Sequence, residues 1–117
     1  MSWGNKFGSP PANFKFDVSY FKNPWRDEEI KNEKDKEIRK SMVIQFMSSQ
    51  KGVLEFTETV AWMIRNIDKT FPDENVVVAL CCSAGEYHSP AMVLLLDHAL
   101  NKLQVKSIIR NSLESKI

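Results

Sequence analysis

The apolar and polar positions of the chain repeat with two different periods, and the period changes several times along the sequence. Residues 14–18 alternate apolar and polar side chains, which is the period of a half-buried strand. Residues 75–82 form an almost continuous apolar run rich in valine, which is typical of a central strand covered on both faces. Residues 104–110 alternate weakly and predict a final strand.

Three other segments carry the period of a helix. Residues 53–71 place apolar side chains at i, i+3, i+4 and i+7, so they predict an amphipathic helix, which Pro72 ends. Residues 41–50 predict a short helix, and residues 90–103 predict a helix with a wide apolar face. Residues 27–40 are mostly charged, with acids before bases, and favour a solvated helix or a mobile linker.

The order of these segments is strand, helices, strand, helix and strand. It indicates an α/β fold with a small, mostly parallel sheet flanked by helices. The last helix and the two strands around it are expected to form a right-handed βαβ unit. Residues 3–13 are interrupted by glycines and prolines, which favour loops and turns. A length of 117 residues favours a single domain over residues 1–117.

Composition and charge narrow the function classes. The net charge of +1 gives no overall attraction to DNA or to a membrane surface, and no run of about 18 apolar residues predicts a membrane span. Cys81 and Cys82 are neighbours that point to opposite faces of a strand, so we expect reduced thiols in a cytoplasmic protein. The cysteines and histidines show no metal-ligand spacing and no Walker A motif is present, so neither a metal nor another cofactor is expected.

Candidate chemistry lies in the turn between the strand at 75–82 and the helix that follows it. Ser89 and Pro90 suit the N-cap and the first residue of that helix. Ala84 and Gly85 are small enough to let the backbone bend sharply. Free backbone N–H groups and the positive end of the helix then meet at the carboxyl edge of the sheet. This arrangement predicts a site for an anion such as phosphate.

Side chains of the same turn offer further donors and one candidate nucleophile. The hydroxyl of Ser83 and the ring of His88 are expected to face a bound anion. Cys82 followed after five residues by His88-Ser89 also has the spacing of the C-x5-R-[ST] loop of cysteine phosphatases. Histidine cannot supply the planar fork with which arginine clamps phosphate, so a phosphatase is the weaker alternative. A packed thiol is the structural alternative for Cys82.

Two blocks of the sequence match motifs of a known family. Residues 3–10 and 16–24 echo the motifs FGFK-x-G-x-P and FDVR-x-L-x-NP, and residues 81–90 echo GCTGG-x-HRSV. Together these blocks resemble the C-terminal domain of the RapZ family, bacterial RNase adapter proteins that sense an amino-sugar phosphate and bind small RNAs. The resemblance implies a fold like a subdomain of phosphofructokinase. It also implies a regulatory, ligand-binding domain, here as a diverged copy without the family's N-terminal P-loop domain.

The resemblance assigns ligand contacts to the turn and to nearby positions of the first block, and it matches Lys6 to a lysine that family members direct toward RNA. The expected ligand-binding residues are Cys82, Ser83, Ala84, Gly85, Glu86, Tyr87, His88, Ser89, Asp17, Asn23 and Trp25. The residues expected to contact RNA are Lys6, Lys102, Lys106 and Arg110.

Three departures from the family pattern affect the expected ligand. Tyr87-His88 stand in place of a His-Arg pair, Ser19 stands in place of an arginine, and Trp25 stands in place of a histidine. Because cationic groups for a sugar phosphate are missing, a different phosphorylated ligand is expected.

These observations predict a non-enzymatic binding domain for a phosphorylated small molecule or an inorganic anion. An RNA-binding adaptor and an oligomerising decoy of a RapZ-like protein are the alternatives. In the second alternative, aromatic side chains near irregular segments would form the contact surface of a homo-oligomer; otherwise they pack into the core from loops. These side chains are Trp3, Phe7, Phe21 and Trp25.

Overall fold

The computed structural model describes residues 1–117, and it has the predicted α/β architecture. Three strands and four α-helices form the fold, with two short 3-10 helices in the connections. In chain order, the elements are β1 (Ser2–Gly4), η1 (Asn5–Phe7), β2 (Phe14–Asp17), η2 (Pro24–Arg26), α1 (Glu28–Asn32), α2 (Lys36–Ser48), α3 (Val53–Thr70), β3 (Val78–Cys82) and α4 (His88–Lys102).

The sheet has the strand order β1-β3-β2, and both pairings are parallel. β3 is therefore the central strand, and all five of its residues are buried. This confirms the reading of the apolar run as a strand covered on both faces. Leu80 of β3 lies opposite Ser2 of β1 on one side and opposite Phe16 of β2 on the other.

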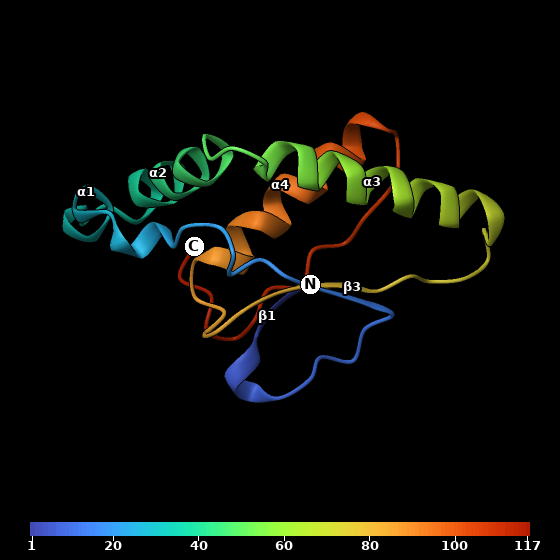
Figure 1. Cartoon of the computed structure of the whole chain (residues 1–117), viewed down its shortest axis with the longest axis horizontal. Coiled ribbons are helices and arrows are strands. Elements are labelled where there is room, and N and C mark those ends of the chain that lie inside the picture. Colours follow the sequence, from blue (N-terminus) through green and yellow to red (C-terminus); the bar gives the residue numbers. More distant parts are fainter.

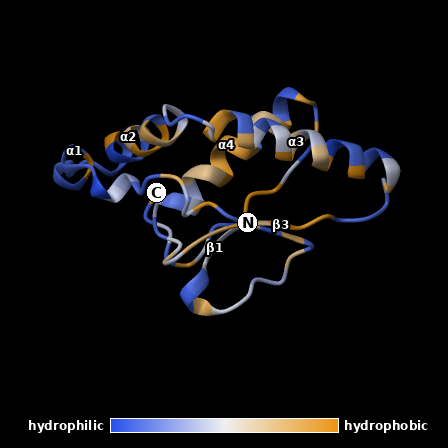
Figure 2. Ribbon diagram, in the orientation of Figure 1, coloured by the Kyte–Doolittle hydropathy of each residue, from blue (hydrophilic) through white to orange (hydrophobic).

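The helices cover one face of the sheet (Figure 1). Alternate residues of β3, namely Val78, Leu80 and Cys82, belong to the hydrophobic core that α2, α3 and α4 complete. Ala79 and Cys81 alternate with these residues, so they point to the other face, where they are also buried. Figure 2 shows that β3 and much of α4 are apolar, whereas α1 is hydrophilic.

The third strand is not the one that the sequence predicted. Residues 104–110 form no strand, and Gln104 turns the chain with a positive φ of 60°. The short segment Ser2–Gly4 takes the edge position instead, although its glycine and its position in the glycine- and proline-rich stretch indicated a loop. The predicted βαβ unit around the last helix is therefore wrong. The helical connection joins β2 to β3 through α1, α2 and α3.

The remaining helix predictions hold with shifted ends. The amphipathic helix at 53–71 is confirmed as α3, while the segment at 41–50 is the second part of a longer helix, α2. The charged stretch at 27–40 forms α1 and the first turn of α2, each opened by an aspartate that caps two backbone N–H groups, Asp27 and Asp35. No helix has both the length and the apolar character needed to cross a bilayer.

Candidate functional site

All three strands of the sheet end at the same edge. The parallel register places Gly4 beside Cys82, and it places Asp17 beside Cys81. From this edge the chain passes through residues 83–87 into α4. Asp17 and the predicted turn are therefore neighbours, as the rule for carboxyl edges of parallel sheets leads one to expect.

The helix after the turn begins two residues earlier than the capping pattern predicted. Its first residue is His88 and its N-cap is Tyr87, which makes no side-chain capping hydrogen bond. The prediction of Ser89 as N-cap is therefore wrong. Ser89 is fully buried, and its hydroxyl accepts a hydrogen bond from the Cys82 thiol at 3.3 Å and donates one to the Trp3 carbonyl at 3.4 Å. It thus joins α4 to β3 and β1.

Two glycines allow the turn to lie directly against β1. Gly85 has a φ of +72°, a left-handed conformation that favours glycine. Gly4 has an ordinary φ, but a Cβ built there would lie only 2.6 Å from the carbonyl carbon of Ala84. The N–H of Gly85 donates to the sulfur of Cys82 at 3.2 Å, which closes the turn over the end of the strand.

Most backbone N–H groups of the turn donate no hydrogen bond within the chain. Among the seven residues from 83 to 89, the amide of Gly85 alone has an acceptor. Tyr87, His88 and Ser89 are buried, and buried N–H groups in proteins normally have partners. Unpaired donors at a helix N-terminus carry the positive end of the helix dipole, so they favour an anion. The residues with free N–H groups are Ser83, Ala84, Glu86, Tyr87, His88 and Ser89.

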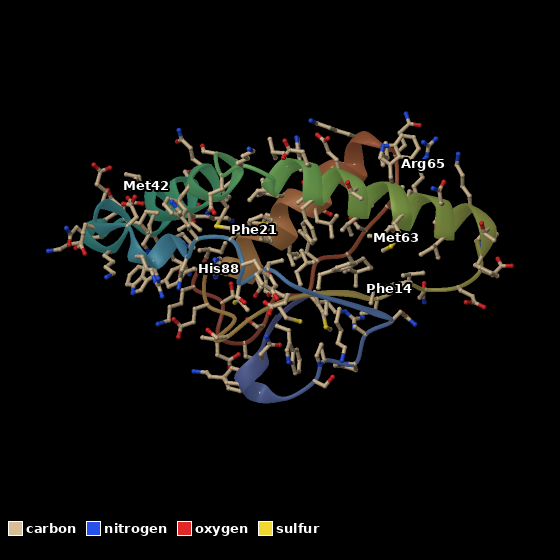
Figure 3. The ribbon with its side chains drawn as sticks, viewed as in Figure 1. Phe14, Phe21, Met42, Met63, Arg65 and His88 are labelled. Atoms are coloured by element: carbon tan, nitrogen blue, oxygen red, sulfur yellow. The ribbon has the colours of Figure 1, made fainter.

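The ring of His88, which was expected to donate to the anion, makes a hydrogen bond within the chain. Its ring nitrogen Nε2 lies 2.7 Å from the carbonyl oxygen of Phe21, so the ring is directed to the segment after β2 (Figure 3). Burial lowers the pKa of His88, and its hydrogen bond to Phe21 opposes this effect in part. A neutral ring that donates to Phe21 is the state that this environment favours.

Trp25 lies beside the turn because it contacts Tyr87, whereas Asn23 contacts Trp25. The rings of Trp25 and Tyr87 are stacked, with centroids 4.5 Å apart and planes 5° apart. Asn23 caps η2, because its side chain accepts the N–H of Trp25 at 3.0 Å. Trp25 and Phe21 are partly buried against the core, whereas Phe7 is 48% exposed. The two aromatic residues near β2 thus pack rather than form an open surface.

Charged side chains near the turn carry both signs. Asp17 is exposed, and one of its carboxylate oxygens accepts the N–H and the hydroxyl of Ser19. Burial raises the pKa of the Cys81 thiol, and the nearby Asp17 carboxylate adds to this effect. Glu86 lies 3.8 Å from the ammonium group of Lys116 in a partly exposed ion pair. The electrostatic attraction for an anion therefore comes mainly from the backbone.

The four basic residues proposed for RNA do not gather at this site. Lys6 is close to it, because its N–H donates to the carbonyl of Ser83 at 3.1 Å. Lys102 ends α4, and a helix of 15 residues places it about 22 Å from the first turn. Lys106 and Arg110 lie in the non-helical segment after α4.

The contact between the segment after residue 110 and the turn was not predicted from the sequence. The hydroxyl of Ser112 donates to the carbonyl of Gly85 at 2.6 Å, and the N–H of Lys116 donates to the carbonyl of Glu86 at 2.9 Å. Polar residues without periodicity carry no signal for such contacts.

The cysteine-phosphatase alternative lacks support. No arginine stands in the loop, and the Cys82 sulfur accepts a hydrogen bond from the Gly85 N–H and donates one to the Ser89 hydroxyl. No group of three or more histidine, cysteine, aspartate or glutamate side chains is arranged so that it could hold a metal ion.

Comparisons with known proteins relate this domain to one family. The family described as RapZ C-terminal domain matches residues 1–113. A "Nucleotide-binding protein" from Thermosipho africanus is 29% identical over 93 residues, which cover 76% of this chain and 32% of that protein. A second "Nucleotide-binding protein", from Pediococcus pentosaceus, is 28% identical over 112 residues, which cover 92% of this chain and 37% of that protein. The chain thus spans about a third of the length of these relatives. No solved structure gives a significant match.

Proposed function

Since the chain belongs to the RapZ C-terminal domain family, we propose that it is a binding domain that holds a phosphorylated small molecule at the turn between β3 and α4. The observation that carries the proposal is the group of six backbone N–H donors without acceptors in the chain at residues 83–89. Phosphate oxygens accept several such bonds at once, and the positive end of α4 adds to their attraction.

The names of the relatives guide the choice of ligand. Both are called nucleotide-binding proteins, so nucleotides are the first phosphorylated compounds to test. The match covers only about a third of each relative, so the name alone does not assign their ligand to this domain. Backbone donors recognise the phosphate group itself, whereas the rest of the ligand would contact residues at the rim of the turn, such as Asp17 and Ser19.

The electrostatics of the site predict how the ligand is held. His88 is turned toward Phe21, and Asp17 and Glu86 place negative charge nearby. Backbone N–H groups carry no titratable proton near neutral pH. Affinity for phosphate should therefore change little between pH 6.5 and 8, apart from the titration of the phosphate itself, whose second pKa is about 6 for an ester.

Amide chemical shifts test the proposal directly. The ¹⁵N-labelled protein is titrated with inorganic phosphate, a nucleoside monophosphate, a sugar phosphate and a short 5′-phosphorylated RNA. The free nucleoside and sugar serve as matched controls. The expected result is a saturable shift of the amide protons of residues 83–89 with the phosphorylated compounds only. If none of them shifts these amides at millimolar concentration, the turn is not a phosphate site. A shift centred on Lys6 with RNA alone would favour the RNA alternative.

A further inference from the structure

Both ends of the chain contact the turn, and all of the hydrogen bonds that they donate to residues 83–87 go to its carbonyl oxygens. The N–H of Lys6, just after β1, donates to the carbonyl of Ser83. The hydroxyl of Ser112 donates to the carbonyl of Gly85, and the N–H of Lys116 donates to that of Glu86. Three of the peptide groups between residues 83 and 87 are therefore fixed by their oxygen atoms.

Fixing the oxygen of a peptide group also fixes its N–H. A trans peptide is planar, so its C=O and N–H bonds point in opposite directions. No peptide bond in the chain is cis. The N–H groups that share these three peptides belong to Ala84, Glu86 and Tyr87. They must point away from the segments that bind the oxygens, and each of them lacks an acceptor in the chain.

The segment that supplies two of these contacts is itself attached to the sheet. The N–H of Ser112 donates to the hydroxyl of Ser2 at 2.8 Å, and the N–H of Ser2 donates to the carbonyl of Arg110 at 2.9 Å. Ile117 packs against the core, and the side chains of Lys116 and Glu86 form an ion pair. Figure 1 shows the C-terminus beside the start of α4, far from the other end of that helix.

We infer that residues 110–117 form a brace that aims the N–H groups of Glu86 and Tyr87 at the ligand, with Ser112 as a positioning residue. The inference rests on the proposed function, because it assigns these two amides to the phosphate. Without the brace, the two peptide groups of the turn are free to rotate. Part of the binding free energy is then spent on ordering them, so affinity falls.

Two pairs of variants test the brace. Ser112→Ala removes the hydroxyl donor, whereas Ser112→Thr keeps it. Lys116→Pro removes the N–H donor, whereas Lys116→Ala keeps it and removes only the ion pair with Glu86. Each protein is titrated with inorganic phosphate, and the dissociation constant is read from the amide protons of Glu86 and Tyr87. The amide spectrum of α3 reports whether the fold is intact.

Ser112→Ala and Lys116→Pro should each weaken phosphate binding about tenfold, the effect of losing one hydrogen bond to a charged group. Ser112→Thr and Lys116→Ala should bind within about twofold of the parent protein, since each keeps the donor. If all four variants bind phosphate as the parent does, the brace has no positioning role, although the phosphate site remains. If the parent protein itself shows no shift at the turn, the proposed function and the brace both fail.

Discussion

Replacing Gly85 by alanine tests the close packing on which the geometry of the turn depends. Two separate penalties act at this position. The left-handed φ of +72° costs a residue with a Cβ about 1–2 kcal/mol. The new methyl group would also lie 2.9 Å from the backbone nitrogen of Gly4 and 2.9 Å from the hydroxyl of Ser112. Overpacking of this kind costs about 1–3 kcal/mol.

Two other glycines separate these penalties. Gly52 has a φ of +91°, and a Cβ there would meet only the ring of Phe21, at 3.9 Å. Gly4 has a φ of −99°, but its Cβ would lie 2.6 and 2.7 Å from the carbonyl atoms of Ala84. Alanine also lowers the conformational entropy of the unfolded chain, and this stabilises the folded protein by about 0.4–1 kcal/mol in each case. Gly52→Ala therefore measures conformational strain, and Gly4→Ala measures crowding.

We expect losses in the free energy of unfolding of about 1 kcal/mol for Gly52→Ala, about 1–2 for Gly4→Ala and about 2–4 for Gly85→Ala. Urea unfolding followed by circular dichroism gives all three values. The free energy of unfolding of a small domain is about 5–15 kcal/mol, so each variant should still fold. The reasoning is refuted if Gly85→Ala loses no more stability than Gly52→Ala. In that case the turn would not press on β1 and Ser112.

Two further predictions concern the neighbours of the turn. Burial lowers the pKa of His88 below its usual 6.5, so the unfolded chain takes up that proton at a higher pH than the folded chain does. The contribution of His88 to the free energy of unfolding should be fully present above about pH 7. It should decrease as the pH drops below 6.5 toward the pKa of the folded state. In urea unfolding at several pH values, His88→Gln should flatten this dependence, and the exposed His98→Gln should leave it unchanged; equal profiles for all three proteins would contradict the burial argument. Trp25→Ala removes the stacked partner of Tyr87 and should cost about 2–4 kcal/mol in the same assay, whereas Trp62→Ala, 51% exposed, should cost less than about 1. Similar losses for the two tryptophans would show that the stack adds no stability.

The sequence predicted the elements whose patterns are long and regular. The valine-rich run predicted β3, and the apolar period of residues 53–71 predicted α3. Both patterns follow directly from which faces of the element are buried. The charged stretch before α2 was ambiguous, since solvated helices and linkers have similar compositions. Asp27 and Asp35, which cap α1 and α2, were the local signals that separate the two cases.

The features that the sequence did not predict depend on contacts between distant segments. Three residues are too few for a strand pattern, so β1 was hidden among glycines and prolines. Serine is a common N-cap residue, but the hydroxyl of Ser89 forms hydrogen bonds with Cys82 and Trp3 instead. His88 looked like a donor for the ligand because nothing in the sequence indicates its contact with Phe21. The position of the turn was predictable, whereas the direction of its side chains was not.

The pairing of Ser2 with residues 110–112 has a consequence for the order of folding. The hydrogen bond from Ser112 to Ser2 joins residues that are 110 positions apart in the chain. Contacts between such distant residues close large loops, and they slow folding because the entropy of closure is lost before the contact forms. The helices and the β2–β3 pair can form from nearer segments. The edge strand β1 can pair with β3 without residues 110–116, whereas the proposed site is completed only when those residues return to the turn.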